Sequence, residues 1–364
     1  MGKRNKVTTR DIAEYVNLSQ STVSMILSKR ANVSFSRETI SRVEEAAKEL
    51  GYKKPEAGVK KKEKNLAKSI IVICPTFSNG YYTMVNQSIN EQAQKYGYTV
   101  FTVSTLRDAD QEASYLKLLL GFELAGIIAL YPPDKMAASN TLSKQVPFVL
   151  IGDKPKNCRF DSVELDSKKT GYMIGEHLIE LGHRHITFVS FPIKAKEINR
   201  IYRLEGLRES FENYGIDPAQ IIIQTPSSSD YRKYNPDNPE YENGYLQTKK
   251  ALQEHTLSTA FIGNNDITAY GIMAAIADCG YKIPKDFSVC GFDNFSLSGM
   301  PQISLTTAEH AARQKGKEAV DMIYRKNQQK KDTSNHSYIM RMEYEPELIV
   351  RKSTGKCPIR DDRK

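Results

Sequence analysis

Polar side chains gather on one face of a short helix expected near the N-terminus. After Ser19, a good N-cap, Val23, Ile26 and Leu27 recur at helical spacing and define a buried face. The opposite face carries Gln20, Ser21, Ser24 and Met25. Amide and hydroxyl groups can exchange hydrogen bonds with base edges, so this face has the chemistry of a surface that reads DNA.

That helix is the second of two short helices joined by a tight turn at 17–19. Thr8 and Asp11 predict a capping box at the start of the first helix. A third helix is expected over 36–50 and ends before Gly51. Two short helices with such a turn form a helix-turn-helix unit, whose second helix enters the major groove. The alternative is a three-helix bundle with no role in DNA binding.

The distribution of charge favours the DNA-binding interpretation. Residues 1–68 hold 16 Lys and Arg against 8 Asp and Glu, and so carry +8 of the net charge of +9. A small basic module on a nearly neutral body is the electrostatic footprint of a DNA-binding head. A solvated basic tail would have the same charge but not the helical pattern.

The run 7–52 resembles the head of the lactose/galactose repressor (LacI/GalR) family, with D-I-A, L-S-x-x-T-V-S, N-V-S and E-L-G-Y in register. The resemblance implies that Gln20, Ser21 and Met25 read bases. It also implies that hydroxyl side chains hold DNA phosphates, namely those of Thr8, Ser19, Thr22 and Ser34. Many relatives carry Arg or His at the position of Met25. Methionine cannot donate a hydrogen bond, so its contact with a base would be apolar.

Residues 55–67 are expected to link this head, residues 1–54, to the rest of the chain. The segment is rich in lysine and contains Gly58. The family often forms a hinge helix here and places a Leu as a minor-groove wedge, but this chain has only Val59 and Leu66 on either side of that position. We expect a flexible charged linker. The alternative is a segment that contacts phosphates without a strong kink.

From residue 68 to 354 short buried strands alternate with helices. The strands are expected at 69–74, 98–103, 126–130, 147–151, 186–190, 220–224, 259–262 and 287–292. The helices between them include 81–96 and 109–120. This alternation predicts an α/β fold of parallel sheets with helices on both faces, in two lobes that hold a ligand at the carboxyl ends of their strands. We assign 68–164 and 306–325 to the first lobe, 165–305 and 326–354 to the second, and 355–364 to a basic tail.

The body also resembles the sensor of the same family and periplasmic sugar-binding proteins, through elements such as N-G-Y-Y (79–82), N-D-x-x-A-x-G (265–271) and G-F-D-N (291–294). Residue by residue, the resemblance implies ligand contacts at Tyr81, Tyr82, Asp153, Arg203, Asn265 and Asp293. Tyrosine rings would stack on the ligand, while the carboxylates, amide and guanidinium would bond to its oxygens. A carbohydrate is the expected effector. A purine-like metabolite or a partner protein is the alternative.

Each of these contacts also has a purely structural interpretation. The tyrosines could pack at an interface, Asn265 could cap a helix, and Asp293 could close a loop. Arg203 could pair with Glu197 or Glu205 on its own helix. The polar segment 226–245 has no counterpart in the family, and we expect a surface loop; its tyrosines could instead rim the ligand entrance.

Other functional classes find little support in the sequence. The chain has no glycine-rich phosphate loop, H-E-x-x-H or G-x-S-x-G motif, so we expect no enzyme, cofactor or metal. Five cysteines without metal or redox spacing favour a reducing cytoplasm. A transport-type binding protein would need a secretion signal, and no apolar run reaches the ~20 residues that cross a bilayer. We therefore expect a cytoplasmic repressor that binds double-stranded operator DNA as a homodimer and is switched by a small ligand.

Overall fold

The computed structural model describes residues 7–28, 35–52, 65–193, 198–227, 234–235, 237–254, 256–329 and 338–358. The chain forms two compact units, Met1–Lys64 and Asn65–Lys364, which we call the head and the sensor. The phosphate contact expected at Ser34 and the linker expected over 55–64 lie outside the described residues.

The head contains the three expected helices, α1 (Thr9–Tyr15), α2 (Gln20–Ser28) and α3 (Arg37–Glu49). The predicted capping box is present, because Thr8 Oγ1 accepts from the Asp11 amide and the Asp11 carboxylate accepts from the Thr8 amide. Apolar side chains from all three helices form one small core. Its buried members are Ile12, Ala13, Val16, Val23, Ile26, Val43, Ala46 and Ala47.

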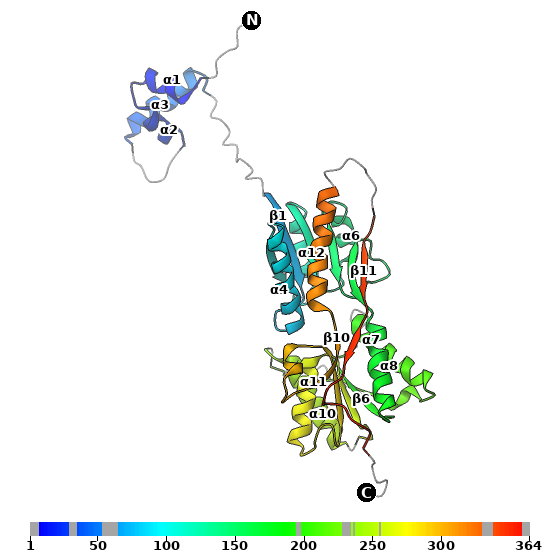
Figure 1. The fold of residues 1–364 in the computed structure, drawn as a ribbon. Helices are drawn as coiled ribbons and strands as arrows, with labels where there is room; N and C mark the ends of the chain where they lie inside the picture. Colours follow the sequence, from blue (N-terminus) through cyan, green and yellow to red (C-terminus); the bar gives the residue numbers. More distant parts are fainter. Residues whose placement is uncertain are drawn as a thin grey trace. The chain divides into compact units, whose positions relative to one another are not determined.

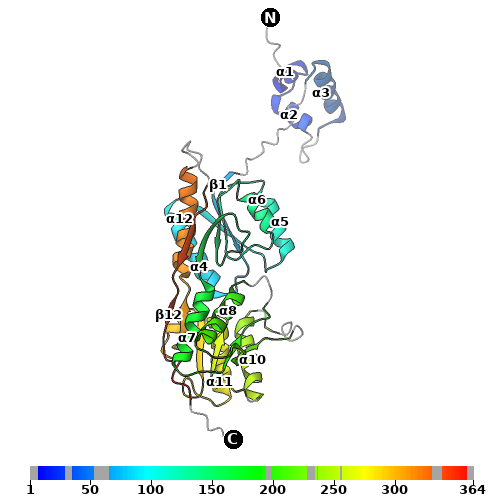
Figure 2. The same cartoon turned by 90° about the vertical axis from the view of Figure 1, so that its right-hand side faces the viewer.

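The first lobe of the sensor is built on a parallel sheet in the order β11-β5-β4-β3-β1-β2 (Figure 1). Its strands are β1 (Asn65–Cys74), β2 (Thr99–Ser104), β3 (Glu123–Ala129), β4 (Phe148–Ile151), β5 (Asp161–Leu165) and β11 (Arg341–Tyr344). Figure 2 shows helices on both faces of the sheet. One face is covered by α4 (Gly80–Lys95) and α12 (Ala312–Gln329), and the other by α5 (Ala109–Leu119) and α6 (Met136–Leu142).

The second lobe has a sheet in the order β12-β10-β9-β8-β6-β7, parallel except for β12. Its strands are β6 (Ile186–Val189), β7 (Ile221–Gln224), β8 (Ala260–Gly263), β9 (Ser288–Asp293), β10 (Thr306–Glu309) and β12 (Glu347–Ile349). Its longer helices are α7 (Ser167–Glu180) and α8 (Ile198–Asn213) on one face, and α10 (Pro239–Gln253) and α11 (Asp266–Asp278) on the other. The short helices η1 (Pro218–Gln220) and η2 (Ser296–Gly299) complete the lobe.

The chain crosses between the lobes after β5, after β10 and again after β11. The assignment of residues 306–354 to the two lobes, as expected from the sequence, is therefore wrong in two places. Strand β10 belongs to the second sheet, although the pattern assigns 306–325 to the first lobe. Strand β11 belongs to the first sheet, although the pattern assigns 326–354 to the second lobe. Both are four-residue strands, too short for a local pattern to reveal which sheet they join.

The start of the sensor and the start of the C-terminal tail also differ from the boundaries expected from the sequence. Strand β1 starts at Asn65, and Leu66 pairs with Leu124 of β3, so residues 65–67 belong to the sheet and not to the linker. A register shift between Leu66 and Ile70 interrupts the apolar pattern and hides this start. At the other end, the Cys357 amide donates to the Leu181 carbonyl, so part of the expected basic tail is bonded to the second lobe.

Helices α7 and α8 cross at very close range through two glycines. A Cβ on Gly171 would collide with the backbone carbonyl of Arg203 on α8. A Cβ on Gly206 would collide with the carbonyl of Lys168 on α7. This crossing fixes α8, and with it the backbone from which Arg203 projects. Across the described ranges, no helix is long and apolar enough to span a membrane.

Candidate functional site

The expected base-reading face of α2 lies on the surface of the head. Gln20, Ser21 and Ser24 are exposed, and Met25 is half-buried. The Ser19 hydroxyl accepts from the Thr22 amide at 3.1 Å and so begins the helix. These side chains form a polar surface at the helix N-terminus, where the macrodipole favours the anionic phosphates of DNA.

The phosphate contacts expected at Thr8, Ser19 and Thr22 lie near the N-termini of α1 and α2. The Ser19 and Thr22 hydroxyls are 2.8 Å apart. Thr8 is already engaged by Asp11 in the capping box. All three residues keep their hydroxyl groups at the ends of helices, where backbone amides are also available to an anion.

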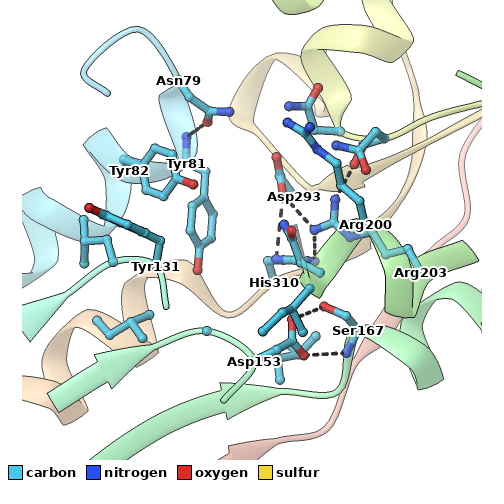
Figure 3. Close-up of a pocket in the computed structure, with 18 of the residues that line it drawn as sticks. Asn79, Tyr81, Tyr82, Tyr131, Asp153, Ser167, Arg200, Arg203, Asp293 and His310 are labelled. Atoms are coloured by element: carbon cyan, nitrogen blue, oxygen red, sulfur yellow. Dashed lines mark hydrogen bonds and ion pairs between the residues drawn. The ribbon is translucent and has the colours of Figure 1, made fainter. Parts of the chain in front are cut away.

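In the sensor, all six expected ligand contacts line one cavity between the lobes (Figure 3). Tyr81 and Tyr82 come from the first turn of α4, and Asp153 follows β4. Three more come from the second lobe: Arg203 from α8, Asn265 from the N-cap of α11, and Asp293 from the last position of β9. The carboxyl ends of strands thus supply the site, as expected for open α/β sheets.

The tyrosines form one wall and a buried polar cluster faces them across the cavity, as Figure 3 shows. In this cluster Arg203 Nη2 donates to His310 Nε2 at 2.9 Å and lies 3.8 Å from Asp293 Oδ1. Arg203 Nη1 donates to the backbone carbonyl of Asn264. The guanidinium carbon lies 4.4 Å from the centroid of the Phe292 ring. Arg203 therefore pairs across elements, not with Glu205 on its own helix.

The contacts of His310 define its tautomer. Because His310 Nε2 accepts from Arg203, its proton is on Nδ1, which lies 3.7 Å from Asp293 Oδ1. Burial, together with the charges of Arg203 and Lys315, lowers the pKa of His310 well below its usual value and keeps the ring neutral. Burial raises the pKa of Asp293 well above its usual value, against the opposing effect of Arg203. Asp293 also has a φ of 117°, a strained conformation for a non-glycine residue.

Asp153 and Asn265 are held by the helices that they face. Asp153 Oδ2 accepts from the Ser167 hydroxyl at 2.7 Å, at the N-terminus of α7. Burial is the main reason that its pKa is raised. Asn265 Oδ1 accepts from the Thr268 amide at 2.9 Å and caps α11, so the capping interpretation of Asn265 is correct even though the residue also lines the cavity.

Sequence reasoning missed several residues that line the same cavity. They are Asn79, Arg107, Tyr131, Arg200, Glu240, His310 and Lys315. Asn79 Nδ2 donates to both carboxylate oxygens of Glu240, at 2.9 and 3.0 Å, and so connects the first lobe to the second. Lys315 is only 2% exposed, and its Nζ lies 5.1 Å from the centroid of the Tyr81 ring.

The segment 226–245 is not only a surface loop. Its last part forms the start of α10 at Pro239, and this places Glu240 in the cavity wall. A proline at the first helical position is a signal that could have located this helix. Tyr234 is buried against Phe191 instead of lining the cavity, and Tyr245 donates to Asp278. In the described part of the chain, no group of His, Cys, Asp or Glu side chains is placed to hold a metal ion.

Comparisons with known proteins find matches for both the head and the sensor. Residues 8–55 match the model for bacterial regulatory proteins of the lacI family, and residues 176–354 match the periplasmic binding protein-like domain. The HTH-type transcriptional repressor PurR of Histophilus somni (strain 129Pt) is 28% identical over 350 residues, which cover 95% of this chain and 98% of that protein.

Solved structures show the same fold. The Lac repressor bound to ONPG in the repressed state has 24% identity and a TM-score of 0.67, covering 96% of this chain and all of that chain. A LacI family regulator from Enterococcus faecium with bound ribose has 24% identity and a TM-score of 0.67, and the match covers 79% of this chain and 99% of that chain. The regulator CelR in complex with cellobiose has 18% identity and a TM-score of 0.65, and the match covers 96% of this chain and 100% of that chain.

Fold and site together define a DNA-binding transcription regulator with a ligand-binding sensor. The chain belongs to the lacI family of bacterial regulatory proteins, with a periplasmic-binding-protein-like sensor domain. This is a family of regulators, not of enzymes.

Proposed function

We propose that this protein is a cytoplasmic transcriptional repressor that binds operator DNA as a homodimer and is controlled by a carbohydrate held between the lobes of its sensor. The observation that carries the ligand class is the adjacency of Arg203 and Asp293, 3.8 Å apart, opposite the ring of Tyr81. A sugar hydroxyl both donates and accepts hydrogen bonds, so vicinal hydroxyls match a guanidinium beside a carboxyl group. Tyr81 then offers a face to the sugar ring.

Two further observations support this choice. The relatives from Enterococcus faecium and CelR carry ribose and cellobiose in their structures. The Tyr81 and Tyr82 rings meet edge to face, with an interplanar angle of 75°. They do not form a parallel pair between which a flat purine could be held, so the tyrosine wall favours a puckered ring. The similarity to repressors named PurR supports repression as the mode of control.

The ligand class can be tested on the full chain with an operator fragment selected from random DNA. Gel retardation in the presence of neutral sugars, acidic sugars, hypoxanthine and guanine should show a changed operator affinity with a sugar. A change with a purine alone would contradict the carbohydrate proposal. A change with neither, but with a protein from lysate, would point to a partner protein as the signal.

Dimerisation is supported by apolar residues on the free edges of both sheets. Phe101 on β2 is 47% exposed, and Ile222 and Ile223 on β7 are 37% and 36% exposed. Both strands are the last in their sheets. Exposed apolar edge strands are costly in a monomer and are commonly covered by a partner. We propose that a second copy of the chain covers them.

Charged residues at the edge of β7 should therefore weaken the dimer. We expect sedimentation at micromolar concentration to give a dimer for the wild-type chain and a larger monomer fraction for the double variant Ile222→Lys, Ile223→Lys. Tyr214→Lys, which replaces another exposed apolar side chain away from β7, should remain dimeric. Equal monomer fractions in all three proteins would contradict this interface.

Met25 should determine the base preference at one position of each half-site. Met25→Arg replaces an apolar contact with a bidentate donor, for which guanine is the usual partner. We expect the preferred base at that position to change, with about 1–3 kcal/mol of new discrimination. Selection from random DNA would measure it, with Ser28→Arg at the exposed end of α2 as the control. Identical selected sites for wild type and Met25→Arg would remove Met25 from the reading face.

A further inference from the structure

Lys315 is a buried cation in the cavity wall that lacks an acceptor. Its side chain is 2% exposed. Among the described residues, Lys315 Nζ makes no hydrogen bond and no ion pair within 4.0 Å, and its neighbour is the Tyr81 ring at 5.1 Å. Burying an ammonium group without a partner is costly, and proteins normally pair or neutralise such a group.

The position of Lys315 gives no compensating stability. It lies in the first turn of α12, where the helix dipole disfavours a positive charge. Burial lowers the pKa of Lys315 to about 8, although Asp153 and Asp293 act in the opposite direction. A residue that costs stability and lines a cavity is a candidate for function.

Two of the three carboxylates that line the cavity already have protein donors, and the third has an ion-pair partner. Asp153 accepts from Ser167, and Glu240 accepts from Asn79. Asp293 lies beside Arg203. Arg203 Nε has no hydrogen-bond partner either, but it is fully buried, so the donor that the protein leaves for a ligand in the cavity is the Lys315 ammonium.

The formal charges of the lining residues lead to the same conclusion. The cations are Arg107, Arg200, Arg203 and Lys315, and the anions are Asp153, Glu240 and Asp293. Among these lining residues the cations outnumber the anions by one. A ligand with an anionic group would give the Lys315 ammonium a direct partner, whereas a neutral ligand would leave it with the longer-range charges of Asp153, Asp293 and Glu309.

We propose that the effector carries an anionic group, a carboxylate or a phosphate, that pairs with Lys315, so that the sensor selects an acidic sugar over the corresponding neutral sugar. This inference rests on the proposed carbohydrate-binding function and adds the charge of the ligand. The sugar ring lies against the tyrosine wall, its hydroxyls bond to Asp293 and Asn265, and its anion lies against the first turn of α12.

Isothermal titration of the full-length protein tests the ligand charge. The probes are hexuronates and aldonates, hexose 6-phosphates and the parent neutral sugars, with acetate and inorganic phosphate as controls at equal ionic strength. We expect at least one acidic sugar to bind ten-fold or more tightly than its neutral parent, and the carboxylate and phosphate arms identify the anion. Equal or tighter binding of the neutral parent would overturn the inference but leave the carbohydrate proposal intact. Binding of a purine with no sugar response would overturn both.

Two variants on the same helix assign the selectivity to Lys315. Lys315→Met keeps the length of the side chain and removes its charge, and it should abolish the preference for the acidic sugar over its neutral parent. Lys317→Met removes the same charge at an exposed position two residues along and should behave as wild type. An unchanged preference in Lys315→Met would contradict the assignment.

A ligand-free measurement keeps the inference testable whichever sugar is the effector. Because the buried charge is unpaired without ligand, Lys315→Met should raise the Tm of the ligand-free protein by a few degrees, and Lys317→Met should leave it unchanged. A lower Tm for Lys315→Met would show that Lys315 stabilises the sensor, and the inference would then fail.

Discussion

Arg203→Ala is expected to abolish the response to the effector while the affinity for operator DNA stays unchanged. Arg203 is 3% exposed and holds Asn264, His310 and Asp293 around the cavity. Truncating one partner of a buried hydrogen-bonded charge pair costs about 2–5 kcal/mol of binding, or at least a 30-fold loss of effector affinity. The residues that we propose to read the operator are on α2, in the other unit of the chain.

Gel retardation with and without effector measures both quantities on one sample. Arg208→Ala, at an exposed position on the same helix, is the matched control and should respond normally. Arg203→Lys keeps the positive charge but loses the planar guanidinium that donates paired hydrogen bonds. This variant should fold even if Arg203→Ala does not, and it should still lose most of the response to effector. A normal response in Arg203→Lys and Arg203→Ala would exclude Arg203 from the site.

Gly206→Ala is expected to lower the stability of the sensor markedly. The added Cβ would collide with the Lys168 carbonyl, a backbone atom that cannot move without separating α7 from α8. Overpacking of this kind costs about 1–3 kcal/mol and sometimes more. Because α8 also carries Arg203, effector affinity should fall together with stability.

Urea denaturation followed by circular dichroism would measure the stability change. Gly121→Ala is a suitable control, because its Cβ would lie 3.6 Å from the nearest atom, the Leu118 carbonyl oxygen, which is an ordinary contact distance. Gly206→Ala should shift the midpoint to lower urea while Gly121→Ala changes it little. Equal midpoints for the two variants would show that α7 and α8 can separate at low cost.

The regular elements were predictable because their signals are local. The capping box of α1, the glycine after α3 and the apolar runs of β1, β3 and β8 each follow from a few adjacent residues. Strands β5, β10, β11 and β12 were missed because DSVEL, TTAE, RMEY and ELI are short and carry charged residues. Their strand character comes from pairing with distant segments, which a single sequence does not display.

The cavity was predictable only in part, for a related reason. Tyr81, Asp153 and Asp293 stand at strand ends or helix starts within recognisable motifs. Glu240 follows a polar stretch without periodicity, and Lys315 lies on a helix whose amphipathic pattern assigns it no special role. What makes Lys315 unusual is the burial of its charge among residues from both lobes. This burial depends on how α12, in the last third of the chain, packs against the first lobe.

The three crossings of the chain between the lobes also affect how the protein folds during its synthesis. The first lobe needs α12 to cover Ala125 and Ile128, and the second needs β10 between β9 and β12. Both pieces leave the ribosome near the end of translation, after residue 300 of 364. Domains are usually completed in the order of their synthesis, but here neither lobe can be. A prematurely terminated chain would therefore leave two incomplete cores attached to an intact DNA-binding head.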